Sequence, residues 1–160
     1  MQSIQRTHQS SEYLNPHNPD ILVHQFFRDF SFALTEGDIA SLKSRWALPS
    51  YIVGNAMQLV IKSENEIEKL FAGTKEQYNR RGITEALADI ESIQWLTDKI
   101  ALVGVRWPYY NREGHEIGEE SSCYTLKVMP EGNLQIVCAV MQGASDESAK
   151  EFPESFPAGH

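Results

Sequence analysis

The amino-acid sequence predicts an α+β domain in which a curved, mainly antiparallel sheet wraps around helices. Apolar residues recur at helical spacing through most of the chain up to Gly82, which favours helices there. After Gly82 the spacing changes to alternation in four long segments, which favours strands. A chain of 160 residues suits one domain, which buries roughly 70% of its unfolded surface. The predicted order is helix, helix, strand, strand, helix and four strands, typical of the α+β class.

The first helix is predicted from Pro19 to about residue 36. Asn18 is a good N-cap, and Pro19 suits the first helical position because an N–H there would have no partner inside the helix. Gly37 ends the helix as a left-handed C-cap, and Asp38 caps a second, short helix within residues 38–46. The first helix has one apolar face, formed by Val23, Phe26, Phe27, Phe30 and Leu34.

A short hairpin and a third helix follow. Residues 50–62 are typical of two short strands joined at Gly54-Asn55. Ser63 and Glu66 have the spacing of a capping box, so the third helix begins there and continues to a stop at Gly82. Its apolar face comprises Ile67, Leu70, Phe71, Thr74 and Tyr78.

Four long strands are predicted over residues 83–96, 99–111, 116–129 and 133–143. The turns between them fall near Thr97-Asp98, Glu113-Gly114 and Glu131-Gly132. Two-residue turns at the last two places set the register, and alternation then divides the side chains between two faces. The face that we assign to the inside pairs Val103 with Tyr124, Val105 with Ser122, Trp107 with Glu120, Ala139 with Tyr124 and Met141 with Ser122. The other face carries Ile100, Leu102, Arg106, Cys123, Thr125, Ile136, Cys138 and Val140.

The outer face is too apolar for a sheet surface in water. No predicted helix remains to cover its apolar row, and monomers rarely expose such a patch. The sequence therefore predicts a homodimer through the outer sheet face. The apolar row consists of Ile100, Leu102, Ile136, Cys138 and Val140.

Composition excludes several classes of function. The net charge of −8 repels nucleic acid and anionic membranes. The densest basic cluster, Arg80-Arg81, lies at a predicted helix end, where it complements the helix dipole. The histidines lack metal-ligand spacing, so we expect no metal and no cofactor. The chain shows no targeting signal or membrane span, which favours the cytoplasm. Flexible tails are expected at residues 1–17 and 144–160, around a domain of residues 18–143.

Two stretches carry a resemblance to a known family. The segment "LTEGDIASL" and the segment "ALVGVRWPYYNREGHEIGEESSCYTLKVMPEGNLQIV" resemble the nuclear transport factor 2-like superfamily, which includes SnoaL-like and ketosteroid-isomerase-like proteins. The resemblance covers roughly Ile21 to Gly143. It implies a cone fold, in which a curved sheet and helices enclose a pocket, and often a dimer through the outer sheet face.

The same resemblance indicates where isomerase chemistry would lie. In isomerase-like members a helical tyrosine, a carboxylate after the first strand and an acid on a later strand act on the substrate. The matching positions here are Phe30, Gly54 and Tyr124, which keep only one polar side chain. No catalytic residue is therefore assigned. The expected ligand pocket comprises Phe27, Phe30, Trp46, Val103, Val105, Trp107, Glu120, Ser122, Tyr124 and Met141.

Two classes of function remain open. The first is a module that binds a small hydrophobic molecule without catalysis, which the absence of a clear base favours. The second is a SnoaL-like or dehydratase/isomerase-like enzyme for a small cyclic or polyketide-type substrate, using Tyr124, Ser122 and Glu120. A carboxylate with a perturbed pKa inside the cavity would favour the enzyme.

Overall fold

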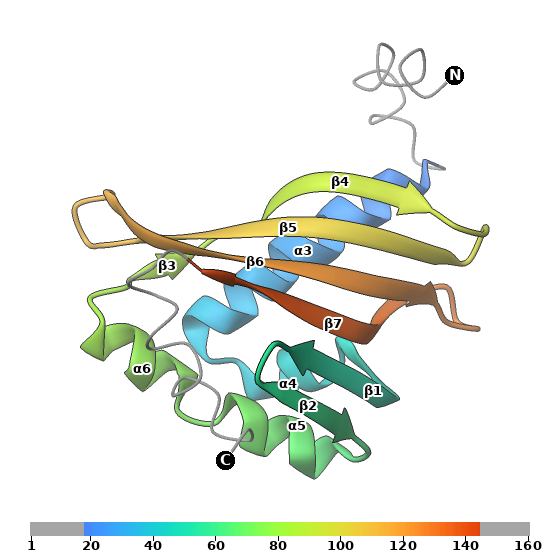
Figure 1. Cartoon of the computed structure of the whole chain (residues 1–160), viewed down its shortest axis with the longest axis horizontal. Helices are drawn as coiled ribbons and strands as arrows, with labels where there is room; N and C mark the ends of the chain where they lie inside the picture. The colour runs from blue at the N-terminus through green and yellow to red at the C-terminus, as the bar shows by residue number, and fades with distance from the viewer. Residues whose placement is uncertain (1–17, 145–160) are drawn as a thin grey trace.

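The computed structural model describes residues 18–144, so both predicted tails lie outside the described residues, apart from residue 144. The expected α+β fold is confirmed: a curved, mainly antiparallel sheet packs against helices (Figure 1). The helices are α3 (Pro19–Glu36), α4 (Ile39–Lys43), α5 (Glu64–Phe71) and α6 (Thr74–Arg80). The strands are β1 (Trp46–Gly54), β2 (Met57–Ile61), β3 (Glu85–Ala86), β4 (Asp89–Trp95), β5 (Ile100–Tyr110), β6 (Glu116–Val128) and β7 (Leu134–Ala144).

Helix α3 has the predicted ends. The Asn18 side chain accepts a hydrogen bond from the backbone N–H of Asp20, and Gly37 adopts the left-handed conformation, with φ of 72°. The backbone N–H of Gly37 donates to the carbonyl of Ala33. Asp38 then caps α4 by accepting from the backbone N–H of Ser41. These local bonds explain why one helix ends and the next begins within two residues.

Gly37→Ala should lower the free energy of unfolding by about 1–2 kcal/mol, because a left-handed residue with a Cβ costs that much. The added Cβ would also lie 3.3 Å from the Cβ of Lys75. Urea denaturation measures the change. Gly37→Asn is the control and should lose less, since asparagine tolerates this conformation better. Equal stability of Gly37→Ala and the wild type would contradict the account of this cap.

Strand β1 begins at Trp46, four residues before the predicted start at Ser50. The prediction was wrong because Pro49 interrupts the strand pattern. Proline has no N–H for the ladder, and the register between β1 and β7 shifts between Trp46 and Tyr51, where Pro49 lies. The early start matters for the site, since it holds Trp46 on the sheet rather than on a helix.

The predicted third helix is two helices. Its capping box is confirmed in part: the Ser63 side chain accepts from the backbone N–H of Glu66, while the Glu66 carboxylate accepts from the N–H of Lys62. The helix breaks at Gly73, whose φ of 82° is left-handed and cannot continue a helix. Helices α5 and α6 therefore lie at an angle along the lower edge of the molecule in Figure 1.

The sheet contains seven strands within the described residues, in the order β2-β1-β7-β6-β5-β3, and β4 also pairs with β5. Only the β1–β7 pair is parallel. The predicted strand 83–96 is divided into β3 and β4, which pair with different parts of β5. The predicted inner pairs are all confirmed, including Val103 with Tyr124 and Trp107 with Glu120.

Ile136 was predicted on the outer face, and this was wrong. Thr125 pairs with Cys138, but Leu126 pairs with Ile136, so Val137 is an extra residue in β7. Such a bulge reverses the alternation on one side of it. Ile136 consequently points inward and is fully buried.

Helix α3 runs across the inner face of the sheet (Figure 1). Aromatic rings form much of the contact, with Phe27 5.1 Å from Tyr124 and Phe30 5.7 Å from Trp107 between ring centroids. No helix among residues 18–144 has the length and apolar character needed to cross a membrane.

Candidate functional site

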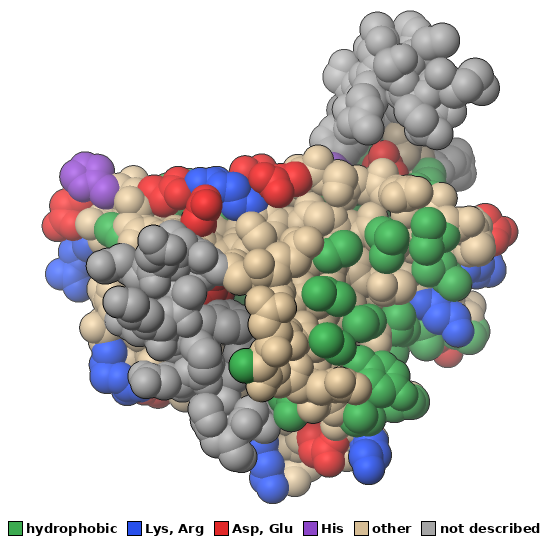
Figure 2. Space-filling model, in the orientation of Figure 1, with side chains coloured by type: hydrophobic (Ala, Val, Ile, Leu, Met, Phe, Trp, Pro, Cys, Tyr) green, Lys and Arg blue, Asp and Glu red, His purple; other side chains and the backbone are tan. Residues whose placement is uncertain are grey.

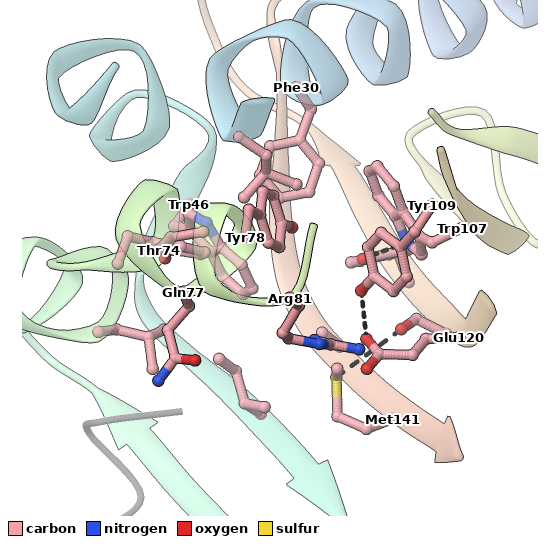
Figure 3. A pocket seen from close by; sticks show the side chains of 17 residues that line it. Phe30, Trp46, Thr74, Gln77, Tyr78, Arg81, Trp107, Tyr109, Glu120 and Met141 are labelled. Atoms are coloured by element: carbon pink, nitrogen blue, oxygen red, sulfur yellow. Dashed lines mark hydrogen bonds between the residues drawn. The ribbon is translucent and has the colours of Figure 1, made fainter. Parts of the chain in front are cut away.

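A cavity remains between α3, the α5–α6 pair and the inner face of the sheet (Figure 3). Its volume is about 90 Å³, which is room for roughly six to nine water molecules at about 10–15 Å³ each. Its walls are mainly apolar and aromatic. The lining residues are Phe30, Leu34, Trp46, Ile52, Leu70, Phe71, Thr74, Gln77, Tyr78, Arg81, Trp107, Tyr109, Glu120, Ser122, Tyr124, Ala139 and Met141.

Seven of the ten residues expected to line a pocket do line this cavity: Phe30, Trp46, Trp107, Glu120, Ser122, Tyr124 and Met141. The other three, Phe27, Val103 and Val105, are buried in the core and do not reach it. Phe27 packs against the ring of Tyr124. Val103 and Val105 precede Trp107 along β5, whereas the cavity uses Trp107 and Tyr109.

Helix α6 and Tyr109 complete the polar lining, and sequence reasoning missed their part in the site. Thr74, Gln77, Tyr78 and Arg81 all line the cavity, although Arg81 was assigned only to the helix dipole. The alternation that placed Trp107 inside continues to Tyr109, so the sequence held a signal for that residue. No local pattern indicated that α6 would close the cavity.

Glu120 is the buried acidic residue of the site, with 7% of its surface exposed. The Tyr109 hydroxyl donates to its Oε1 over 2.6 Å. Burial raises the pKa of Glu120 from 4.5 to about 7, because removal from water disfavours the ionised form. The hydrogen bond from Tyr109 and the positive charge of Arg81 oppose this shift. Glu120 can therefore take up or release a proton near neutral pH.

Arg81 and two tyrosines surround this carboxyl group. The Arg81 guanidinium carbon lies 5.3 Å from the centroid of the Tyr109 ring, and Tyr78 and Tyr109 have ring centroids 5.7 Å apart. Burial raises the pKa of both phenols well above the ordinary value of 10. Both hydroxyls stay protonated at neutral pH and act as neutral hydrogen-bonding groups.

Tyr124 forms a second polar group in the cavity. Its hydroxyl accepts a hydrogen bond from Trp107 Nε1 over 3.0 Å, and burial raises its pKa above the usual range. The neighbouring Ser122 hydroxyl donates to the sulfur of Met141 over 3.7 Å. Tyr124 still has its own proton to donate, so it is the hydroxyl of this wall best suited to a ligand.

Two buried polar atoms of the lining have no hydrogen-bond partner among the described residues: Trp46 Nε1, a donor, and Glu120 Oε2, an acceptor. Unpaired buried polar atoms are costly and uncommon in native proteins. Figure 3 shows Trp46 and Glu120 on opposite sides of the cavity. Each atom could be satisfied by a molecule that enters the space between them.

The positions that resemble an isomerase site do not assemble one. Phe30 lines the cavity without a hydroxyl, and Gly54 ends β1 without reaching the cavity. Tyr124 is the only polar member of the three. Within residues 18–144, no three His, Cys, Asp or Glu side chains gather in a way that could hold a metal ion.

Comparisons with known proteins agree with this fold. Similar solved structures include an NTF-2 like protein of unknown function from Shewanella oneidensis, with a TM-score of 0.60, 15% identity and coverage of 78% of this chain and 98% of that one. A protein of unknown function with a cystatin-like fold from Nostoc punctiforme has a TM-score of 0.59 and 13% identity, covering 77% of this chain and 89% of that one. A ketosteroid isomerase-like protein from Erwinia carotovora atroseptica has a TM-score of 0.56 and 11% identity, covering 76% and 93%.

These identities establish the fold alone. No curated protein matches the chain. A family model, described as NTF2-like protein (DUF6841), matches residues 19–144 and so spans nearly all of the described domain. The resemblance carried by the two sequence stretches is thereby confirmed, and the chain belongs to this family of NTF2-like proteins.

Proposed function

We propose that the domain binds a small, largely apolar molecule in the cavity, without requiring catalysis. The supporting observation is a space of about 90 Å³ kept open among aromatic side chains in the centre of the domain. Protein interiors are otherwise close-packed, and binding sites are concave and mostly apolar with a few polar groups. A ligand of one substituted ring matches this size. A steroid does not.

Small ring compounds such as ethylbenzene should bind with dissociation constants between about 1 µM and 1 mM, or roughly −8 to −4 kcal/mol. Thermal shift and tryptophan fluorescence measure this, since Trp46 and Trp107 line the cavity. Ala139→Leu should weaken binding at least tenfold, because Ala139 lines the cavity and the larger side chain would occupy it.

Val140→Leu is the matched control for this experiment. Val140 follows Ala139 in β7 and is 40% exposed on the outer face. The control should bind ring compounds as the wild type does. If no small ring compound shifts the wild-type melting temperature or fluorescence, the binding proposal is wrong.

A proton-transfer enzyme is the second candidate, and Glu120 is the observation that favours it. A buried carboxyl group with a pKa raised to about 7, inside a cavity, is suited to general acid–base catalysis. Glu120 would exchange the proton, and Tyr124 and Ser122 would donate hydrogen bonds to a small cyclic or polyketide-type substrate. Isomerisation of a steroid is not expected, because Phe30 offers no hydroxyl and Gly54 offers no carboxylate at the positions that resemble an isomerase site.

If this candidate is right, the reaction rate of the wild type should change with pH with an apparent pKa near 7. The rate of Glu120→Gln should not change with pH in this range. A substrate whose turnover is equal in both proteins would exclude Glu120 as the acid or base.

We also propose that the protein pairs with a second copy through the outer sheet face. Figure 2 shows hydrophobic side chains gathered there across the strands. Val140 on β7 and Tyr51 on β1 are 40% and 44% exposed, and Leu102 is half-buried on β5, with β6 between it and β7. A two-fold symmetric dimer brings the same patch together on both subunits, so one apolar face is sufficient.

Leu102→Glu should convert the dimer to monomers, because it would bury two uncompensated carboxylates at the interface. Sedimentation velocity at micromolar concentration measures the result. Phe32→Glu is the control, since Phe32 is a 66% exposed residue of α3 rather than of the sheet. A wild-type protein that sediments as a monomer would contradict the proposal.

A further inference from the structure

We infer that the cavity is built for a ring-sized ligand with two polar ends: a hydrogen-bond donor that meets Glu120 and an acceptor that meets Trp46. This inference rests on the proposed binding function and specifies its ligand. The chemical class is a small ring, aromatic or alicyclic, that carries an N–H or O–H at one end and an ether or carbonyl oxygen at the other.

Glu120 forms the acceptor end of the cavity, and Tyr109 holds its carboxyl group in place. Oε1 of Glu120 is occupied by the Tyr109 hydroxyl, so the carboxyl group is held in one orientation and Oε2 is left without a partner among the described residues. Because Glu120 is more than nine-tenths buried, water does not readily satisfy that oxygen. A ligand N–H or O–H would supply the missing bond.

The donor end is Trp46, which is 4% exposed. Its ring is held by Phe30 and Phe71, with centroids 6.3 Å and 5.9 Å away, and its Nε1 has no acceptor within the described part of the chain. An indole N–H is only a donor, so a ligand must present an acceptor to it.

The other two indoles show that Trp46 is exceptional. Trp95 Nε1 donates to Asp20 over 2.9 Å, and Trp107 Nε1 donates to Tyr124 over 3.0 Å. Only Trp46, of the three, combines a place in the cavity lining with an unpaired N–H. The Trp46 indole N–H signal therefore serves as the reporter, and the signal of Trp95, which does not line the cavity, is the internal control in the same spectrum.

Four isosteric probes test the inference: 4-methoxyphenol with both polar ends, 4-ethylphenol with the hydroxyl, 4-methylanisole with the ether and 4-ethyltoluene with neither. Each is titrated at pH 8 into the wild-type protein, Glu120→Gln and Trp46→Phe. The readouts are dissociation constants and the indole region of the ¹H–¹⁵N spectrum. In Glu120→Gln the amide oxygen can still accept from Tyr109, which turns the amide NH₂ toward the ligand.

The hydroxyl should favour binding, relative to the matching methyl group, about tenfold more in the wild type than in Glu120→Gln, as for a hydrogen bond to a charged group. The ether should favour binding about fivefold more in the wild type than in Trp46→Phe. The Trp46 indole proton should move downfield with the two ethers, while the Trp95 signal keeps its hydrogen-bonded position.

Equal affinity for all four probes in all three proteins would overturn the inference and leave the binding proposal standing. If only the hydroxyl or only the ether changes the affinity in the expected variant, the inference of a ligand with two polar ends is wrong. Binding of none of the probes, with no movement of the Trp46 signal, would overturn the binding proposal and this inference with it. The spectrum of the wild type gives this answer even if a variant fails to fold.

Discussion

Phe30→Ala should lower the free energy of unfolding by about 3–5 kcal/mol, the range for removing a buried phenylalanine. Phe30 is 2% exposed, and its ring packs against aromatic residues of β1, β5 and β6. Its centroid lies 5.7 Å from that of Trp107 and 6.3 Å from that of Trp46, both in edge-to-face geometry. Such aromatic pairs add about 0.5–1.5 kcal/mol to the free energy of burial. Since Phe30 also lines the cavity, truncation enlarges an existing void rather than a space that neighbours could fill.

Phe32→Ala is the matched control, because it removes the same side chain from the same helix at a position that is 66% exposed. It should change the free energy of unfolding by no more than about 0.5 kcal/mol. Guanidinium denaturation of both variants gives the comparison. A loss below about 1 kcal/mol in Phe30→Ala would show that Phe30 is not a main contact between α3 and the sheet.

The wild-type protein should become less stable as the pH rises from about 4.5 to about 7, by about 3 kcal/mol from Glu120 alone. The folded state raises the pKa of Glu120 from 4.5 to about 7, so the folded protein holds a proton that the unfolded chain has lost in this window. One pKa unit corresponds to about 1.36 kcal/mol. The stabilisation is fully present below pH 4.5 and is lost as the pH rises through 7.

Glu120→Gln removes this titration and keeps an oxygen to accept from Tyr109, so the variant should gain on the wild type by about 3 kcal/mol between pH 4.5 and pH 8. Urea denaturation across this range measures the difference. His24 acts in the opposite direction, because burial lowers its pKa, but it is present in both proteins and cancels. Parallel curves for the two proteins would show that Glu120 does not keep its proton in the folded state near neutral pH.

The same titration affects binding. A ligand that donates a hydrogen bond to Oε2 favours the ionised form of Glu120, so its binding should strengthen as the pH rises through 7 and should not change in Glu120→Gln. An apolar ring without a hydrogen-bond donor should bind with the same affinity below and above pH 7. The dependence of affinity on pH therefore separates the two kinds of ligand without any change of assay.

The sequence by itself determined the ends of the first helix, the start of the second and the predicted pairs on the inner sheet face. Asn18, Gly37 and Asp38 act on backbone groups within a few residues, so their effect can be read locally. The pairing of Trp107 with Glu120 and of Tyr124 with Ala139 agrees with the prediction, but each pair lies beyond a register shift, between Tyr109 and Tyr110 in one hairpin and at Val137 in the other, so turn length alone does not explain it.

Tertiary structure decided where these local rules are interrupted. Gly73 lies inside an apolar helical pattern that continues beyond it, so the pattern alone favours one helix, while the packed chain bends there. In the sequence, Val137 continues the alternation of β7 and gives no sign of a bulge. Only the pairing of β7 with β6 makes Val137 the extra residue that turns Ile136 inward. Neither change has a strong local signal, because each satisfies packing against a distant element.

The volume of the cavity and the burial of its polar groups were decided by tertiary structure alone. The cavity is the volume left unfilled by side chains from three helices and four strands, and no single segment of the sequence encodes that volume. From the sequence, Glu120 was predicted to lie on the inner face opposite Trp107 and to line the expected pocket. It became a buried group with a pKa near 7 because Tyr109, Tyr78 and Arg81 enclose it from β5 and from the end of α6. Its surroundings come from residues up to 42 positions away in the chain, and folding brings them together.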